Sequence, residues 1–231
     1  MKKIVFSFSA IAIVLCALAG LLYSKAKVSL VQPNGTTYPI DKVLMPTYTA
    51  PIKNLKASTL FIPIDKTVPI KGAISKETSE LIYQTIVTQT AFGDSVYLLI
   101  DSEGGDIYAG RQIVEAIEAA RGPVYTICVN SCASMAAFIF EYGTIRYVTP
   151  SSQLMFHPAY GVIGGNIDIM VTEAIATKRY VDEMENFVAH KVGITLKDYK
   201  YESATQNIYL EADQAINRKF ADKVVYLHYV N

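Results

Sequence analysis

The sequence predicts an α/β fold, in which strands and helices alternate along the chain. Short apolar runs, of which residues 96–100 are the clearest, are typical of buried strands. Longer segments with apolar residues at helical spacing lie between them, and one begins at Ser75, a good capping residue. Because the two kinds of segment alternate through most of the chain, a sheet covered by helices is the expected architecture.

The expected strands, taken along the chain, are the short apolar runs at 60–64, 67–71, 96–100, 124–129, 144–148 and 153–157. The expected helices are 75–91, 106–121, 133–142 and 167–192. The second of these ends at Gly122 and Pro123, and the third ends at Gly143. The fourth is apolar on one broad face, so it needs a partner surface, which the same domain can supply.

The first 27 residues predict a hydrophobic N-terminal helix that directs export. Lys2 and Lys3 precede an uncharged run, residues 4–23, which is as long as the roughly 20 residues that span a bilayer. Small residues near its end also permit cleavage, so residues 1–27 are either a signal peptide or a transmembrane signal anchor. In both cases the rest of the chain crosses the inner membrane. It then faces the periplasm or extracytoplasmic space, either anchored or soluble after cleavage.

Residues 28–59 are predicted to be a turn-rich connector, and residues 60–231 a single domain with a substantial core. The whole chain has 21 basic and 21 acidic residues and shows no long basic block in its exported part, so nucleic acid is not an expected partner. The three histidines do not cluster, and Cys128 and Cys132 are expected to be buried packing residues. Neither a metal nor a cofactor is expected.

Two segments carry the residues of a nucleophilic hydrolase. Ser134 lies at the start of the third expected helix, and His157 ends the short apolar strand that follows. A serine nucleophile needs a base within hydrogen-bond reach and donors for the oxyanion. The backbone amide of Met135 at the helix start is one candidate donor. The amide of Gly105, in the turn after residues 96–100, is the other.

Each of these residues also has a purely structural interpretation. A serine near a helix start is usually a cap, a glycine pair is usually a turn, and a lone histidine is more often a core residue. Their order and spacing together favour the catalytic interpretation.

That order resembles the Clp protease proteolytic subunit family, serine peptidases of the crotonase-like superfamily. The resemblance runs from about Leu60 to Val225. It rests on five blocks in the family's order, namely residues 68–74, 98–105, 126–138, 154–158 and 207–215. The resemblance implies a ClpP-type superhelix of strand-helix units. Export would separate the chain from an ATP-driven unfoldase of the cytosol, so the expected substrates are short or already unfolded peptides. The resemblance also implies a homo-oligomer, in which the helix at 167–192 forms a handle between stacked rings.

The resemblance makes Ser134 the nucleophile, His157 the general base, and Gly105 and Met135 the oxyanion donors. The third triad position falls on Asn207, where the family has aspartate. An asparagine cannot stabilise the imidazolium as a carboxylate does, so low activity is expected unless Asp198 or Glu202 takes its place.

These departures leave other functions open. Glu103 replaces the usual proline of the oxyanion turn, and with Asn207 it motivates the alternative of a weak or inactive homologue that acts as an oligomeric binding or scaffold protein. An acyl-CoA enzyme of the crotonase superfamily is disfavoured by the presence of both Ser134 and His157. A serine-lysine peptidase using Lys178 is disfavoured because His157 stands in its proper block.

Overall fold

The computed structural model describes residues 29–31, 37–39 and 56–231. The predicted segment 1–27 and most of the connector lie outside these residues. Strands β1 (Ser29–Val31) and β2 (Thr37–Pro39) form an antiparallel pair in the unit Met1–Thr49. All other elements belong to the unit Ala50–Asn231. No helix within the described ranges combines the length and apolarity that crossing a membrane requires.

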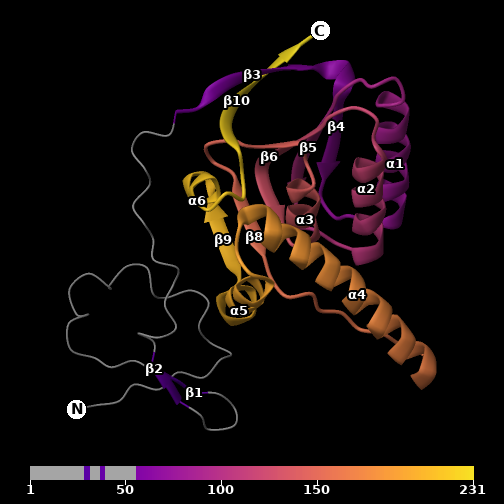
Figure 1. Cartoon of the computed structure of the whole chain (residues 1–231), viewed down its shortest axis with the longest axis vertical. Helices are drawn as coiled ribbons and strands as arrows, with labels where there is room; N and C mark the ends of the chain where they lie inside the picture. Colours follow the sequence, from indigo (N-terminus) through magenta and orange to yellow (C-terminus); the bar gives the residue numbers. More distant parts are fainter. Residues whose placement is uncertain (1–28, 32–36, 40–55) are drawn as a thin grey trace, which may run out of the picture. The chain divides into compact units, whose positions relative to one another are not determined.

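The second unit is built on an eight-stranded sheet (Figure 1). Six parallel strands run in the order β3 (Ser58–Pro63), β10 (Lys223–Val230), β7 (Ile145–Val148), β6 (Val124–Ala133), β5 (Val96–Ser102) and β4 (Thr67–Lys71). Strand β8 (Gln153–Phe156) pairs parallel with the end of β6 and antiparallel with β9 (Ile208–Glu211). A short 3-10 turn, Ile64–Lys66, joins β3 to β4.

The helices pack mainly against one face of this sheet. They are α1 (Lys76–Gln89), α2 (Ile107–Ala119), α3 (Met135–Glu141), α4 (Ile167–Val192), α5 (Leu196–Gln206) and α6 (Ala212–Asn217). Alternate residues of β5, among them Leu98 and Ile100, are fully buried in the core that these helices share with the sheet. A smaller apolar cluster, with Ile62 and Ile127, covers the other face.

The long helix α4 has two different halves. Its buried residues, Met184, Glu185, Val188, Ala189 and Val192, all lie in the C-terminal half. The N-terminal half extends away from the sheet (Figure 1). The same domain therefore covers only part of the apolar face that the sequence predicts for this helix.

The α/β class and most of the predicted elements are confirmed. One expectation was wrong: Ser134 does not lie within the first turn of a helix, because β6 continues to Ala133 and α3 begins at Met135. The backbone of Ser134 has φ 56°, which is incompatible with a right-handed helix. Sequence analysis also missed the last part of the fold, the elements α5, β9, α6 and β10.

A buried ion cluster fixes the C-terminal end of α3. Arg146 of β7 pairs with Glu141 at the end of α3 and with Asp222 ahead of β10, at 2.8 Å between Nη2 and Oδ1 of Asp222. Lys191 of α4 donates to the carbonyl oxygens of Glu141 and Gly143. Glu141 is wholly buried, and its Oε1 has no partner. Because α3 starts next to Ser134, this cluster also helps to fix the position of that residue.

We expect Glu141 to make stability depend on pH. Burial raises the pKa of its carboxyl to about 7, although Arg146 opposes the shift. The folded state then holds the proton more tightly than the unfolded state, so wild type loses stability as pH rises through this range. In urea unfolding, the free energy of unfolding of Glu141→Gln minus that of wild type should increase between about pH 5 and about pH 8.

The exposed carboxyl of Glu115 on α2 provides a control of equal charge change. Glu115→Gln should show no such trend. The expectation would be contradicted if the free energy of unfolding of Glu141→Gln minus that of wild type stayed constant or decreased with rising pH.

Candidate active site

Ser134 occupies a sharp turn between β6 and α3. Its backbone angles, φ 56° and ψ −124°, are rarely adopted by a residue with a side chain. The amide of Ser134 donates to the carbonyl oxygen of Met155 at 2.8 Å, which fastens the turn to the neighbouring strand β8. Met135 is the first residue of α3, so its amide has no acceptor within the helix. The hydroxyl and a free amide therefore leave the same turn.

A glycine turn lies against this one. Gly104 and Gly105 follow β5 with φ of 97° and 154°. A Cβ on Gly104 would lie only 2.9 Å from the amide nitrogen of Met135, so glycine is required by close approach as well as by φ. The turn is held by Ile74, whose amide donates to the carbonyl of Gly104 at 2.9 Å and whose carbonyl accepts from Asp106 at 2.9 Å. These bonds do not use the amide of Gly105.

His157 directly follows β8. Its Nδ1 lies 2.7 Å from the carbonyl oxygen of Pro158. A carbonyl oxygen can only accept, so Nδ1 carries the proton and Nε2 is left as the acceptor. The ring stacks on Tyr160, with centroids 4.8 Å apart and planes at 27°. The imidazole is thus held in the tautomer that a general base requires.

Asn207 directly precedes β9, the strand that pairs with β8. Strands β8 and β9 are antiparallel, and Phe156 is paired with Ile208. The pairing ends there, so His157 and Asn207 are the residues just beyond it on the two strands. Asn207 ends α5 with φ 55°, and its amide donates to Ser203. No hydrogen bond joins the side chains of Asn207 and His157 in the described part of the chain.

The two alternative carboxylates have other partners. The carboxylate of Asp198 accepts from Thr195 Oγ1 at 2.6 Å in the first turn of α5. Glu202 forms two hydrogen bonds of 2.7 Å with the guanidinium of Arg218. Neither makes a hydrogen bond to His157 in this structure.

Ser134, Met135, Gly105 and His157 line one pocket of about 350 Å³. Its other walls are mostly apolar, with Ala73, Ile107, Phe138, Ala159, Val181 and Met184, and Glu103 also lines it. The predicted nucleophile, base and oxyanion residues are therefore brought together around one cavity. No hydrogen bond joins Ser134 to His157 in this conformation. Such bonds are often long before substrate binds.

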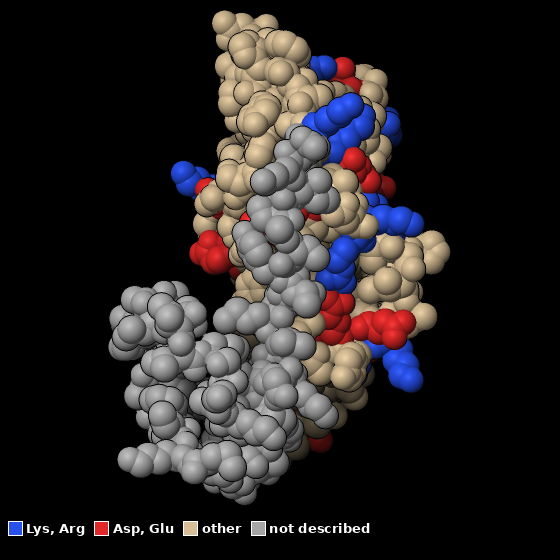
Figure 2. Space-filling view, turned by 90° about the vertical axis from the view of Figure 1, so that its left-hand side faces the viewer, with Lys and Arg blue, Asp and Glu red and all other residues tan. Residues whose placement is uncertain are grey.

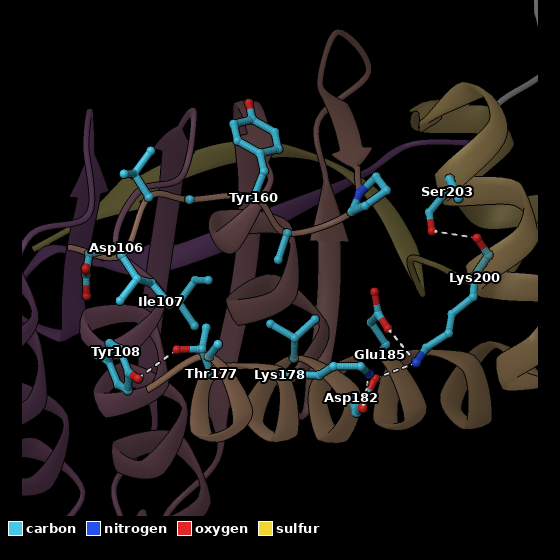
Figure 3. Close-up of a pocket in the computed structure, with 18 of the residues that line it drawn as sticks. Asp106, Ile107, Tyr108, Tyr160, Thr177, Lys178, Asp182, Glu185, Lys200 and Ser203 are labelled. Carbon is cyan, nitrogen blue, oxygen red and sulfur yellow. Dashed lines mark hydrogen bonds and ion pairs between the residues drawn. The ribbon is translucent and has the colours of Figure 1, made fainter. Parts of the chain in front are cut away.

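A second pocket, of about 630 Å³, adjoins the first (Figure 3). Residues that line both are Gly105, Ile107, Ala159, Tyr160 and Val181. Its wall on α4 and α5 carries a charged row, in which Lys178 pairs with Asp182 and Lys200 lies between Asp182 and Glu185. Burial raises the pKa of Glu185, while Lys200 opposes the shift. Together the two pockets form one continuous hollow beside Ser134.

Sequence analysis missed Pro158, Tyr160 and the charged row. Pro158 was noted only as part of a block, and nothing in the sequence indicates that its carbonyl oxygen would bind the imidazole. Tyr160 comes three residues after His157 in a segment without helix or strand. The prediction that Cys128 and Cys132 are buried packing residues is confirmed, since both belong to the main core. Within residues 56–231, no cluster of three or more His, Cys, Asp or Glu side chains could hold a metal ion.

Fold and site together define an α/β protein with the layout of a serine hydrolase. On the face shown in Figure 2, Lys and Arg side chains (blue) are interspersed with Asp and Glu side chains (red), without a broad basic patch.

Residues 57–227 match the Clp protease family, and the chain therefore belongs to that family. The predicted resemblance is thus confirmed, and with it the class of serine-type peptidases.

Among curated proteins, the chain is similar to ATP-dependent Clp protease proteolytic subunit 2 of two Chlamydia species. It is 30% identical to the protein of Chlamydia trachomatis serovar D over 163 residues, which are 66% of this chain and 78% of that protein. Identity to the Chlamydia muridarum protein is 31% over 163 residues, with the same coverage.

The backbone strain at Ser134 gives a stability prediction. A residue with a side chain at φ 56° and ψ −124° costs about 1–3 kcal/mol, and glycine relieves this cost. We therefore expect Ser134→Gly to exceed Ser134→Ala in the free energy of unfolding by about 1 kcal/mol, measured with urea.

Ser131 of β6 supplies the control, because it has no positive φ. At this position Ser131→Gly should have a lower free energy of unfolding than Ser131→Ala. If Gly proves no more stable than Ala at position 134, the turn is not strained as described.

Proposed function

We propose that this chain is a serine endopeptidase that hydrolyses short or unfolded peptides outside the cytoplasm. The observation that carries the proposal is the single pocket lined by Ser134, His157, Gly105 and Met135. A hydroxyl, a base and two sources of backbone donors at one cavity are the minimum set for acyl transfer.

In the proposed reaction Nε2 of His157 takes the proton of Ser134 as Oγ attacks the carbonyl carbon of the scissile peptide bond. The negative charge on the carbonyl oxygen is stabilised by the amides of Gly105 and Met135. The imidazolium then gives its proton to the leaving amine, and the acyl-enzyme forms. A water molecule, activated by the same histidine, releases the second product and restores Ser134.

Substrate size follows from the dimensions of the hollow. The two adjoining pockets, of about 350 and 630 Å³, have room for the side chains of an extended peptide and not for a folded domain. The apolar walls of the pocket beside Ser134 favour an apolar side chain next to the scissile bond.

We also propose a homo-oligomer. Exposed apolar residues gather on the N-terminal half of α4, with exposed fractions of 76% for Ile167, 54% for Ile169, 53% for Val171 and 66% for Ile175. Monomers rarely leave such a patch uncovered. The Chlamydia relatives are named as subunits of a protease. Light scattering from a clean monomer at micromolar concentration would rule the oligomer out.

Export is proposed from the sequence of residues 1–27. The lysine-flanked apolar run at 4–23 supports either an anchor or a cleaved signal, and so contact with a membrane at least during export. A reporter that works only outside the cytoplasm, fused after Asn231, tests this proposal. A stable but silent fusion would overturn it.

A second candidate is a weak or inactive homologue that binds peptides or acts as an oligomeric scaffold. Two observations favour it. Asn207 supplies no charge to His157, and Glu103, an exposed carboxylate, lines the pocket that must hold an oxyanion.

Labelling with a fluorophosphonate distinguishes the two candidates, because the reagent reacts with an activated serine. Wild type should be labelled, while Ser134→Ala and His157→Ala should not. Ser131→Ala, a serine of the same strand, should be labelled like wild type. Equal labelling of Ser134→Ala would place the nucleophile elsewhere, and an unlabelled wild type would favour the scaffold.

The charge at position 207 should limit turnover. The resemblance assigns the third triad position to Asn207, so Asn207→Asp would put a carboxylate where the family has one. We expect turnover of a short peptide to rise by at least about tenfold, which corresponds to roughly 1.4 kcal/mol of transition-state stabilisation. A flat result, combined with loss of activity in Asp198→Asn or Glu202→Gln, would assign the orienting role to one of those carboxylates.

A further inference from the structure

The orientation of His157 does not depend on Asn207 in this structure. Two contacts to its ring come from the segment that follows it: the carbonyl oxygen of Pro158 lies 2.7 Å from Nδ1, and the ring of Tyr160 lies 4.8 Å away between centroids. The Pro158 contact fixes the tautomer, but a neutral carbonyl supplies no full charge. What remains to be supplied is stabilisation of the imidazolium that forms when Ser134 gives up its proton.

Tyr160 has the chemistry for this task. The face of an aromatic ring carries partial negative charge and attracts a cation that lies within about 6 Å of its centroid. The His157 ring lies within that distance and nearly parallel to it. Tyr160 is 83% exposed, so packing does not explain its presence at the mouth of the pocket. Its ring stands clear of the charged row in Figure 3.

We propose that Tyr160 is a positioning residue that stabilises the protonated form of His157, and so replaces part of what a carboxylate at position 207 would contribute. This inference rests on the proposed peptidase function. The step adds no reactant: the proton of Ser134 passes to Nε2 of His157, and the ring of Tyr160 stabilises the resulting cation.

Other charged groups around His157 are few. Glu103, on the oxyanion turn, lines the same pocket. Asp106, Lys178, Asp182, Glu185 and Lys200 line the adjoining pocket, where the lysines and the carboxylates of α4 pair with one another. Asn207, the residue directly before β9, is neutral. Among these groups, Tyr160 is the one whose ring stacks on the imidazole.

The test compares Tyr160→Phe, which keeps an aromatic face, with Tyr160→Leu, which removes it. The first readout is the NMR titration of the His157 ring in the full chain, assigned by its loss in His157→Gln. Loss of the face destabilises the imidazolium, so the titration curve of the His157 ring in Tyr160→Leu should lie at lower pH than that of wild type. Tyr160→Phe should titrate close to wild type.

The second readout is kcat/KM for a short peptide and the rate of fluorophosphonate labelling, both followed against pH. In Tyr160→Leu, kcat/KM and the labelling rate should both fall by about two- to fivefold. The acidic limb of each pH profile should move to lower pH. The value of kcat should change more than that of KM. The fall should be smaller in an Asn207→Asp background, where a carboxylate stabilises the same cation. Tyr160→Phe should rescue both rates.

Two failures are distinguishable. Coincident His157 titrations of wild type and Tyr160→Leu would overturn the inference whether or not the chain hydrolyses peptides. A higher KM in Tyr160→Leu with unchanged labelling would also overturn it, because Tyr160 would then contact only substrate. A wild type that is never labelled, with the titration shifted as expected, would sink the peptidase function and leave the stacking role of Tyr160 intact.

Discussion

The arrangement of the site depends on how the C-terminal end of β6 is paired, with β5 on one side and β8 on the other. Cys132 is paired with Ser102 of β5 and with Leu154 of β8, and all three strands are parallel. Their carboxyl ends therefore lie at one edge of the sheet. The glycine turn follows β5, the serine turn follows β6, and the histidine follows β8. A shift of this register by one residue would exchange the faces of the strands and separate the three groups.

This dependence explains how much could be predicted from the sequence. Ser134, His157 and Gly105 each follow a run of apolar residues, and the ends of buried parallel strands can be read from such runs. Residue-level reasoning could not bring Asn207 to the end of β8, because only the antiparallel pairing of β8 with β9 joins these two parts of the chain, which are distant in sequence. Only the family resemblance reached it. The conformation of Ser134 was misjudged because helical spacing begins right after it.

The C-terminal part of the fold was missed for different reasons. Helix α5 is rich in charged and tyrosine residues and shows little apolar periodicity, so its pattern is weak. Strand β10 shows no strict alternation of buried and exposed residues, and its place next to the edge strand β3 is set by pairing with β3 and β7. The pairing of β10 with β3 joins the two ends of the domain, so no local pattern in the sequence indicates it. Tyr160 was missed because stacking on a neighbouring ring is a property of geometry alone.

The place of β10 between β3 and β7 has a consequence for the time order of folding. In the described sheet β3 pairs only with β10, and β7 gains its second neighbour only from β10. The edge of β3 and one side of β7 thus stay without partners until β10 has been made. Long-range pairing of this type is slow, because the loop it closes spans nearly the whole domain. The sheet therefore reaches its full set of strand pairs only after β10 has been made.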